Sequence, residues 1–205
     1  VAQTIRTFRN TASIDLHMCE NGLIALNPPL TARRIGALST RTAHPHYLSL
    51  MQELFNAIGL GVKINNPHRH ETKGEMLARR ANLPNIGQFA TSTVSCGNWK
   101  RKNIQCGRCW PCSIRRASFH RAGLADGTIY ETHNLVDALA DADYRDDILA
   151  VHTALRRRYD RGLKNWVMQA GPLPQDATER EALYGVVERG MDELENFLTS
   201  HGLSV

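Results

Sequence analysis

One stretch of the sequence reads Ser95-Cys96-Gly97-Asn98-Trp99-Lys100-Arg101-Lys102-Asn103-Ile104-Gln105-Cys106-Gly107-Arg108-Cys109-Trp110-Pro111-Cys112 and holds four of the five cysteines. Thiolates this close in sequence can surround one tetrahedral Zn²⁺, and two-residue spacers let the backbone turn back on the ion. Four thiolates close the coordination shell, so such an ion holds a loop in place and performs no chemistry. We therefore predict a structural zinc site; its ligands are Cys96, Cys106, Cys109 and Cys112.

Two other interpretations of the cysteines stay open. A C-x-x-C pair can be a redox centre, but this leaves two neighbouring cysteines without a role, and no secretory context favours disulfides. A C-x-x-C-x-x-C run is also compatible with an iron–sulfur cluster. We favour zinc because nothing else in the sequence calls for electron transfer.

Composition places the chain among ordinary globular proteins. Its 205 residues are 42% hydrophobic and 22% charged, with a formal net charge of +5 and a pI near 9.1. This length suffices for one domain with a core plus a helical appendage. No apolar run reaches the roughly 18 residues needed to cross a bilayer, so we expect a cytoplasmic protein without a membrane partner. Since the chain begins at Val1 and not at a methionine, we expect it to be part of a longer protein.

The first third of the chain has the pattern of an α/β layer. Apolar and polar residues alternate from Ile14 to Cys19, which predicts a short, half-buried strand. The apolar run 23–26 is closed by Pro28-Pro29, since consecutive prolines end any strand. A helix is expected from Pro45 to a stop at Gly59, and residues 62–64 form the next predicted strand.

The polar segment from residue 31 to residue 44 is predicted to be an extended loop. It carries Arg33, Arg34 and Arg41 beside the hydroxyl-rich run 38–42. Loops at strand ends often hold anionic ligands, while the plainer interpretation is a solvated basic loop. The two interpretations are equally weighted.

A helix start follows the second predicted strand. Thr72 and Glu75 have the spacing of a capping box, in which each side chain bonds the other residue's backbone N–H. Lys73 is not explained by the cap. A lysine at an exposed helix N-terminus is unfavourable for the helix alone, because free N–H groups there favour anions. We therefore expect a bound phosphate or carboxylate near Lys73.

The remainder of the chain is predicted to be helical. A basic helix spans residues 112–123, and its face either is solvated or contacts nucleic acid. From Asn134 onward the apolar spacing is helical throughout, and Gly171-Pro172 breaks the chain before the last helix. One apolar stripe of that helix is expected to face the core: Leu183, Val186, Val187, Met191, Leu194 and Leu198.

Several motifs together resemble a known family. They are Thr72-Lys73-Gly74-Glu75, Ser95-Cys96, Cys106-Gly107-Arg108-Cys109-x-x-Cys112-x-x-Arg115-Arg116 and Phe119-x-x-Ala122-Gly123-Leu124. Over residues 14–130 they resemble the C-terminal half of the QueC family of 7-cyano-7-deazaguanine synthases. The segments 20–31 and 38–42 look more like the QueC-like proteins of antiphage operons, such as the QatC component of Qat defence.

The resemblance implies a fold, a reaction and partners. The fold is α/β, the C-terminal part of a nucleotide α-hydrolase-like (PP-loop ATPase) domain with a zinc module. The reaction is ATP- and Mg-dependent activation of a 7-deazaguanine carboxylate, followed by amide or nitrile formation. In defence-associated relatives the acceptor amine would belong to a protein partner from the same operon. Lys73 would lie near phosphate, and Arg41 and the turn at Glu20-Asn21 near the nucleobase or acyl group; no catalytic residue is assigned.

The sequence departs from the family at one place. It contains no Ser-Gly-Gly-x-Asp-Ser or other glycine-rich phosphate loop, so this chain alone is expected to bind ATP poorly. We expect a QueC-like domain at residues 1–130, with the zinc module at 95–124, and a helical extension at 131–205.

Two further hypotheses compete with the enzyme. One is a zinc-stabilised nucleic-acid-binding module, whose binding would weaken steeply with salt. Its contacts would come from Lys100, Arg101, Lys102, Arg108, Arg115, Arg116 and Arg121. The other is a non-catalytic scaffold that docks a partner through its helical tail.

Overall fold

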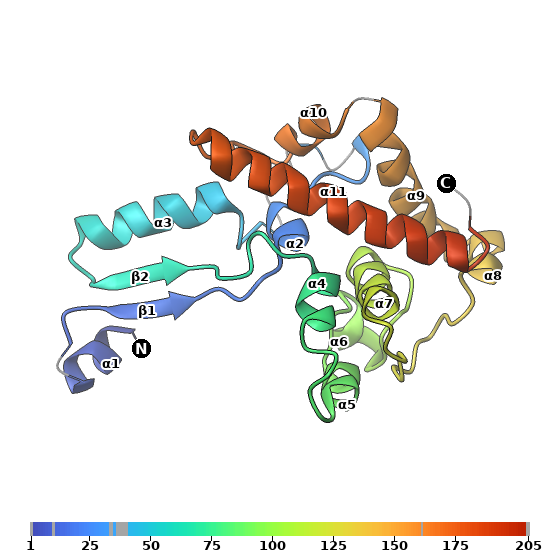
Figure 1. The fold of residues 1–205 in the computed structure, drawn as a ribbon, viewed down its shortest axis with the longest axis horizontal. Coiled ribbons are helices and arrows are strands. Elements are labelled where there is room, and N and C mark those ends of the chain that lie inside the picture. The colour runs from blue at the N-terminus through green and yellow to red at the C-terminus, as the bar shows by residue number, and fades with distance from the viewer. Residues whose placement is uncertain (1, 10, 33–34, 36–40, 161, 204–205) are drawn as a thin grey trace.

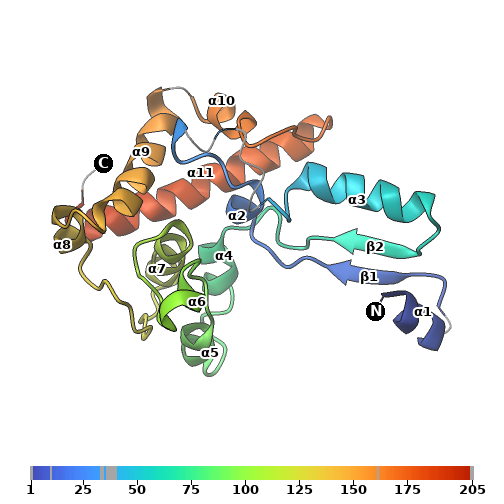
Figure 2. The same ribbon diagram turned by 180° about the vertical axis from the view of Figure 1, so that it is seen from behind.

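The computed structural model describes residues 2–9, 11–32, 35, 41–160 and 162–203. In this part of the chain two parallel strands and flanking helices form an arm, and the other helices form a larger body (Figures 1 and 2). The elements are α1 (Ala2–Arg9), β1 (Ile14–His17), α2 (Gly22–Leu26), α3 (Pro45–Ala57), β2 (Val62–Asn65), α4 (Lys73–Ala78), α5 (Ile86–Ser92), α6 (Trp99–Lys102), α7 (Trp110–Ala122), α8 (Leu135–Ala140), α9 (Arg145–Asp160), α10 (Leu163–Met168) and α11 (Ala177–Ser200).

The arm confirms the predicted strands and helix. Strands β1 and β2 pair in parallel, with Ile14 opposite Val62, and α3 begins at Pro45 as expected. Gln52 on α3 binds the outer edge of β2: its Nε2 donates to Val62 O at 2.9 Å, and its Oε1 accepts from Ile64 N at 2.7 Å. The other edge of the sheet, along β1, has no strand beside it among the described residues.

The predicted half-burial of the first strand is wrong. Only Ile14 in β1 is partly buried, and Leu16 keeps 42% of its surface exposed. No residue of α3 is buried either. Alternation in sequence gives a buried face only where a second layer covers it, and the described residues place only α3 and the short helix α1 beside this sheet (Figure 1). Parallel sheets are normally covered on both faces, so the α/β layer of the arm is incomplete.

The apolar run at residues 23–26 is a helix and not a strand. Asn21 caps α2 by accepting a hydrogen bond from Ile24 N at 3.2 Å, and Asn27 ends it in the left-handed region at φ 44°. Leu23 and Leu26 are fully buried in the core of the body. Consecutive apolar residues suit this short helix because nearly every side chain in it faces other protein.

The long helix α11 runs through the body and confirms the predicted stripe. All six stripe residues are buried, and Figures 1 and 2 show α11 extending along the body from the arm to the C-terminal end. Gly190 lets α2 approach closely, since a Cβ there would lie 2.8 Å from Leu23 Cδ2. None of the described helices combines the length and the apolar character that crossing a bilayer requires.

The helices after residue 131 share one apolar core with earlier segments. A single cluster of buried side chains joins Leu23 of α2, Ile114 of α7 and Leu155 of α9 with Leu194 of α11. In addition, Trp166 donates a hydrogen bond from its Nε1 to Pro29 O at 2.9 Å. The boundary between residues 130 and 131 stays a prediction, and the contacts across it are extensive.

Candidate functional site

The four cysteines of the opening stretch meet in space. The Sγ atoms of Cys96, Cys106, Cys109 and Cys112 all lie within 4.8 Å of one another, and all four residues are buried. The Cys106–Cys112 and Cys96–Cys109 sulfur pairs are 3.9 and 4.0 Å apart. Zn–S bonds of about 2.3 Å place tetrahedral ligands roughly 3.8 Å from each other. The cluster can therefore hold a metal ion with little movement of the sulfur atoms.

Backbone hydrogen bonds support charge on these sulfurs. The N–H groups of Asn98 and Cys106 donate to Cys96 Sγ, and the N–H of Cys109 donates to Cys106 Sγ, each at 3.3 Å. Hydrogen bonds from Cys109 and Cys112 lower the pKa of Cys106, while those with Cys106 and Cys109 raise the pKa of Cys112. Without a cation the four thiols share protons. A bound cation favours the thiolate form of all of them.

Local sequence explains how the knuckle forms. Gly107 adopts φ 81°, and a Cβ there would clash with Thr132 O, so the turn between Cys106 and Cys109 requires glycine. Cys109 is the N-cap residue of α7, and Pro111 lies in the first turn, where its missing N–H removes no helical bond. The cysteines are thus fixed by a turn and by the start of α7.

Lys73 lies beside this cluster. Its Nζ donates a hydrogen bond of 3.1 Å to Ser95 Oγ, directly before the first cysteine of the cluster. Burial lowers the pKa of Lys73, and nearby Glu20 acts in the opposite direction. No carboxylate of the described residues lies within ion-pair distance of Nζ. A largely desolvated ammonium with only a hydroxyl partner favours an anion beside it.

The capping box is confirmed, but the expected open helix start is wrong. Glu75 N donates to Thr72 Oγ1 at 2.9 Å, and Thr72 N donates to Glu75 Oε2 at 2.8 Å. The N–H of Gly74 is also used, because it donates to the carboxylate of Glu193 on α11. The start of α4 therefore offers no row of free N–H groups. Any attraction for an anion comes from the Lys73 side chain.

The turn at Glu20-Asn21 lies next to the loop that carries Lys73. Asn21 Nδ2 donates to Glu20 Oε1 at 2.9 Å, and Gly22 N donates to Glu71 O at 3.0 Å. A Cβ on Gly22 would clash with Arg69 O, so the two segments are in close backbone contact. The structure thus brings two of the predicted substrate-binding elements together, the Glu20-Asn21 turn and Lys73.

Arg41 lies elsewhere among the described residues. It lies beside His44 and beside Gly171, a residue of the segment between α10 and α11. The charge of Arg41 contributes to lowering the pKa of His44. Burial is the larger cause, and the pKa of His44 falls to about 4. Within the predicted basic loop, Arg33, Arg34 and residues 36–40 lie outside the described residues. The predicted role of Arg41 stays a prediction.

The basic residues of the nucleic-acid interpretation are largely used within the fold. Arg115 is 2% exposed and donates to Ala90 O, Thr91 O and the hydroxyls of Thr93 and Thr128. The expectation that α7 exposes it on a solvated or nucleic-acid-binding face is therefore wrong. Its guanidinium instead joins the end of α5 to the segment after α7.

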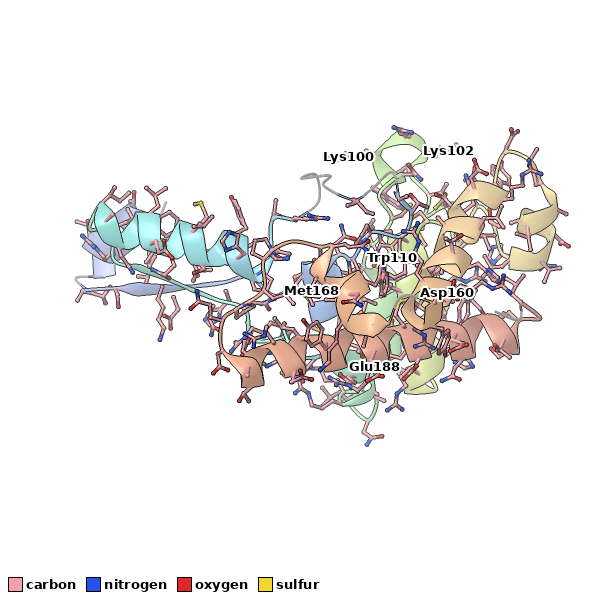
Figure 3. All side chains as sticks on the ribbon, turned by 90° about the horizontal axis from the view of Figure 1, so that it is seen from above. Lys100, Lys102, Trp110, Asp160, Met168 and Glu188 are labelled. Carbon is pink, nitrogen blue, oxygen red and sulfur yellow. The ribbon has the colours of Figure 1, made fainter. Side chains whose placement is uncertain are left out.

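Three further members of that basic set also have internal partners. Arg116 binds the carbonyls of Gly107 and His133, and Glu131 pairs with both Arg108 and Lys102. Lys100 and Arg101 on α6 and Arg121 at the end of α7 remain exposed. Figure 3 shows Lys100 and Lys102 at the outer end of the body and Trp110 in its interior. Lys102 is exposed as well, although it pairs with Glu131. Four of the seven cations therefore face solvent, and the nucleic-acid interpretation stays a prediction.

Sequence reasoning missed two residues of the site. The sequence motifs include Ser95 but assign it no role, and only the fold shows that its hydroxyl faces Lys73. Glu193 lies on the buried face of α11, three residues after Gly190 and beside Leu194. A carboxylate inside an apolar stripe was the available signal for Glu193.

Comparisons with known proteins match the central part of the chain. Residues 42–123, about two-fifths of it, match the family described as "Queuosine biosynthesis protein QueC". This range contains Lys73 and all four clustered cysteines, and it is narrower than the predicted 14–130. Glu20, Asn21, Arg41 and Glu193 lie outside it.

Individual relatives agree with the family match. The 7-cyano-7-deazaguanine synthase of Stenotrophomonas maltophilia K279a is 30% identical over 92 residues, 42% of this chain and 40% of the relative. The synthase of Thiobacillus denitrificans is 39% identical over 72 residues, 35% of this chain and 31% of the relative. No solved structure gives a significant match. The chain thus spans about a third to two-fifths of these relatives, and over this part it is similar to the 7-cyano-7-deazaguanine synthases.

Proposed function

We propose that this chain is the C-terminal part of a QueC-like enzyme that activates a 7-deazaguanine carboxylate with ATP and forms an amide or a nitrile. The observation that carries the proposal is Lys73: a largely desolvated ammonium inside the matched range, with a hydroxyl as its hydrogen-bond partner and no acid within ion-pair distance among the described residues. A phosphate or an activated carboxylate provides a direct anionic partner, which the more distant charges of Glu20 and Cys112 do not.

In this proposal the described residues have separate roles in substrate binding. Lys73 binds the anionic part of the substrate pair, and Ser95 orients its ammonium at 3.1 Å. Glu20 lies on the adjoining turn, where its carboxylate can accept hydrogen bonds from a purine-like base. Asn21 is 2% exposed, and its amide caps α2 and donates to Glu20, so it holds this turn in place. Mg²⁺ and the bulk of the ATP phosphates are not assigned to residues of this chain.

The four-cysteine cluster holds zinc in this proposal. Its sulfur spacing and N–H···S bonds fit a four-thiolate site. The ion neutralises the thiolates and fixes the segment 95–112, which includes Ser95. Because all four positions are cysteines, the ion supplies structure and no catalysis.

The incomplete sheet of the arm supports the proposal that this chain is one part of a larger domain. The exposed Leu16 of β1 and the absence of buried residues in α3 leave apolar surface that further parallel strands and helices cover. We propose that these strands come from a part of the PP-loop domain that also carries the glycine-rich phosphate loop. In the relatives, more than half of the length lies outside the match.

We further propose a role in antiphage defence of the Qat kind, with a protein partner from the same operon as acceptor of the deazaguanine. The similarity of residues 20–31 to that branch supports this, as does the helical part after residue 131, whose α11 packs against α7. The acceptor amine would displace the activating group and become an amide.

The proposal is tested by intact mass spectrometry on the natural full-length protein. It is incubated with ATP, 7-carboxy-7-deazaguanine and its operon partners, as wild type, Lys73→Met and Lys164→Met. Lys164 is the control because it is exposed, where it pairs with the exposed Glu181 and lies over the ring of Tyr184. A mass increase on a partner, lost in Lys73→Met alone, supports ligation, and free nitrile supports the biosynthetic reaction. If neither the partner adduct nor the nitrile forms, the proposed enzyme activity is overturned and the non-catalytic scaffold is favoured.

A further inference from the structure

A buried carboxylate from the C-terminal helix lies against the first residues of α4. Glu193 on α11 is 7% exposed, and its Oε1 accepts a hydrogen bond of 2.5 Å from Thr72 Oγ1. The backbone N–H of Gly74 donates a second hydrogen bond to the same carboxylate. One side chain, 121 residues beyond Thr72, therefore holds the residues on both sides of Lys73.

The glycine at position 74 is explained by this contact. An ideal Cβ at that position would lie 2.5 Å from Glu193 Oε2, closer than nonbonded atoms approach. The backbone of Gly74 is helical and needs no positive φ. A side chain at this position would displace the Glu193 carboxylate, so glycine leaves the space that the carboxylate occupies.

The same helix holds the rest of the loop that leads to Lys73. Arg189 donates from Nε to Glu75 Oε1 at 2.6 Å and from Nη2 to His70 O at 2.8 Å. Nearer the start of α11, Glu179 accepts from Arg69 Nε at 2.9 Å. The loop between β2 and α4 is thus fastened to α11 along its length, and Glu193 binds the point nearest to Lys73.

An apolar residue would fit the buried face of α11 better than Glu193. Burial, with a smaller contribution from the neighbouring Glu75, raises the pKa of Glu193 to about 7. The hydrogen bonds from Thr72 and Gly74 and the charge of Arg121 on α7 act in the opposite direction. A carboxyl group kept in such an environment is unfavourable for stability alone, and buried polar groups of this kind can fix one specific geometry.

We propose that Glu193 is a positioning residue for Lys73. By binding Thr72 and Gly74 it fixes the backbone at Lys73 and thereby directs the ammonium to Ser95, 3.1 Å away. The role of Lys73 in binding phosphate rests on the proposed function, but its placement by Glu193 does not. A helix outside the matched range is therefore part of the site.

The test measures the titration of Lys73 directly. Competitive acetylation followed by peptide mass spectrometry, from about pH 7 to pH 11, reports the pKa of each lysine. The variants are Glu193→Ala, Glu193→Gln, Gly74→Ala and the double variant Gly74→Ala/Glu193→Ala. Glu188→Gln is the matched control, since Glu188 lies on the exposed side of the same helix (Figure 3). Melting temperatures are recorded for every variant, and ATP binding is measured in parallel.

In wild type and Glu188→Gln, the pKa of Lys73 is expected to be lower than the pKa of ordinary lysines. Glu193→Ala and Gly74→Ala are expected to raise the pKa of Lys73 towards the ordinary lysine value. Glu193→Gln is expected to raise it less, because the amide oxygen still accepts a hydrogen bond from Thr72. Gly74→Ala lowers the melting temperature in wild type and has little effect in the Glu193→Ala background, because the clash is gone.

Unchanged Lys73 titration in folded Glu193→Ala would overturn the proposal, as would an equal effect of Gly74→Ala in both backgrounds. If Glu193→Ala does not fold, Glu193→Asp, which withdraws the carboxylate by one methylene, replaces it in the same comparison. A shift of Lys73 without any ATP binding by wild type would support the positioning role and count against the proposed function. The two ideas can therefore fail separately.

Discussion

Lys73 Nζ lies 3.1 Å from Ser95 Oγ, which connects the start of α4 to the residue directly before the cysteine cluster. The predicted metal site and the predicted substrate lysine are therefore one unit in space. Any change in the cluster that moves Ser95 also changes the environment of the ammonium.

Removing the Ser95 hydroxyl is expected to weaken ATP binding by the full-length protein. Ser95→Ala deletes the only hydrogen bond of Lys73 to a described side chain, worth about 1 kcal/mol for a partly exposed group, or roughly fivefold in affinity. Isothermal titration calorimetry measures the change. Ser95→Thr keeps the hydroxyl and serves as control; equal affinities for the alanine and threonine variants would contradict the prediction.

Cys109→Ser is expected to release the metal ion and destabilise the segment 95–112. Structural zinc contributes its binding free energy to folding, so the melting temperature is expected to fall by about 10 °C or more. Metal content by mass spectrometry and thermal unfolding check both effects. Cys19→Ser is the control because Cys19 is exposed and outside the cluster. Normal metal content and melting in Cys109→Ser would exclude a structural metal there.

Glu193 is expected to make the fold less stable as the pH rises from about 4.5 to about 7. Burial raises its folded-state pKa to about 7, so the folded protein holds a proton that the unfolded chain has released. Its contribution is fully present below the unfolded pKa and is lost as pH rises through 7, by about 3 kcal/mol. Urea unfolding of Glu193→Gln across this range is expected to gain stability relative to wild type towards pH 7; a pH-independent difference would contradict this.

His44 is expected to act in the opposite direction. Burial lowers its folded-state pKa to about 4, so the unfolded chain binds a proton that the folded protein excludes. Stability is lost as the pH falls from about 6.5 to about 4, again by about 3 kcal/mol. His44→Asn keeps a capping side chain for α3 without the titration, and its unfolding free energy is expected to fall less than that of wild type on acidification.

Arg115→Met is expected to destabilise the protein by about 2–4 kcal/mol, because it removes the hydrogen bonds that the buried guanidinium donates to Ala90 O, Thr91 O and the hydroxyls of Thr93 and Thr128. Arg101→Met, on the exposed face of α6, is expected to stay within about 0.5 kcal/mol of wild type. Urea unfolding of both variants checks the difference. Similar values for the two variants would show that Arg115 has no structural role.

Much of the local structure could be predicted from sequence. Pro45 and Gly59 defined α3, the Thr72–Glu75 spacing gave the capping box, and helical apolar spacing gave the buried face of α11. These features depend on residues a few positions apart, and their physics acts within one helix or turn. The cysteine spacing belongs to the same class, since a short loop can close on one ion.

Other features depended on what the fold brings together. Whether β1 buries a face depends on a second layer, and whether residues 23–26 form a strand or a helix depends on the core that receives them. Arg115 has the sequence context of a surface arginine, yet the end of α5 covers it. Local spacing carries no information on such distant partners.

The sequence by itself determined the four-cysteine knuckle, the capped helix start at Thr72 and the lysine beside it. Only the tertiary structure decided that Ser95 faces Lys73 and that Glu193 occupies the space beside Gly74. The physical reason is that burial and unpaired charge are properties of the packed chain. The ammonium of Lys73 and the carboxylate of Glu193 lose most of their water only because segments distant in sequence pack around them.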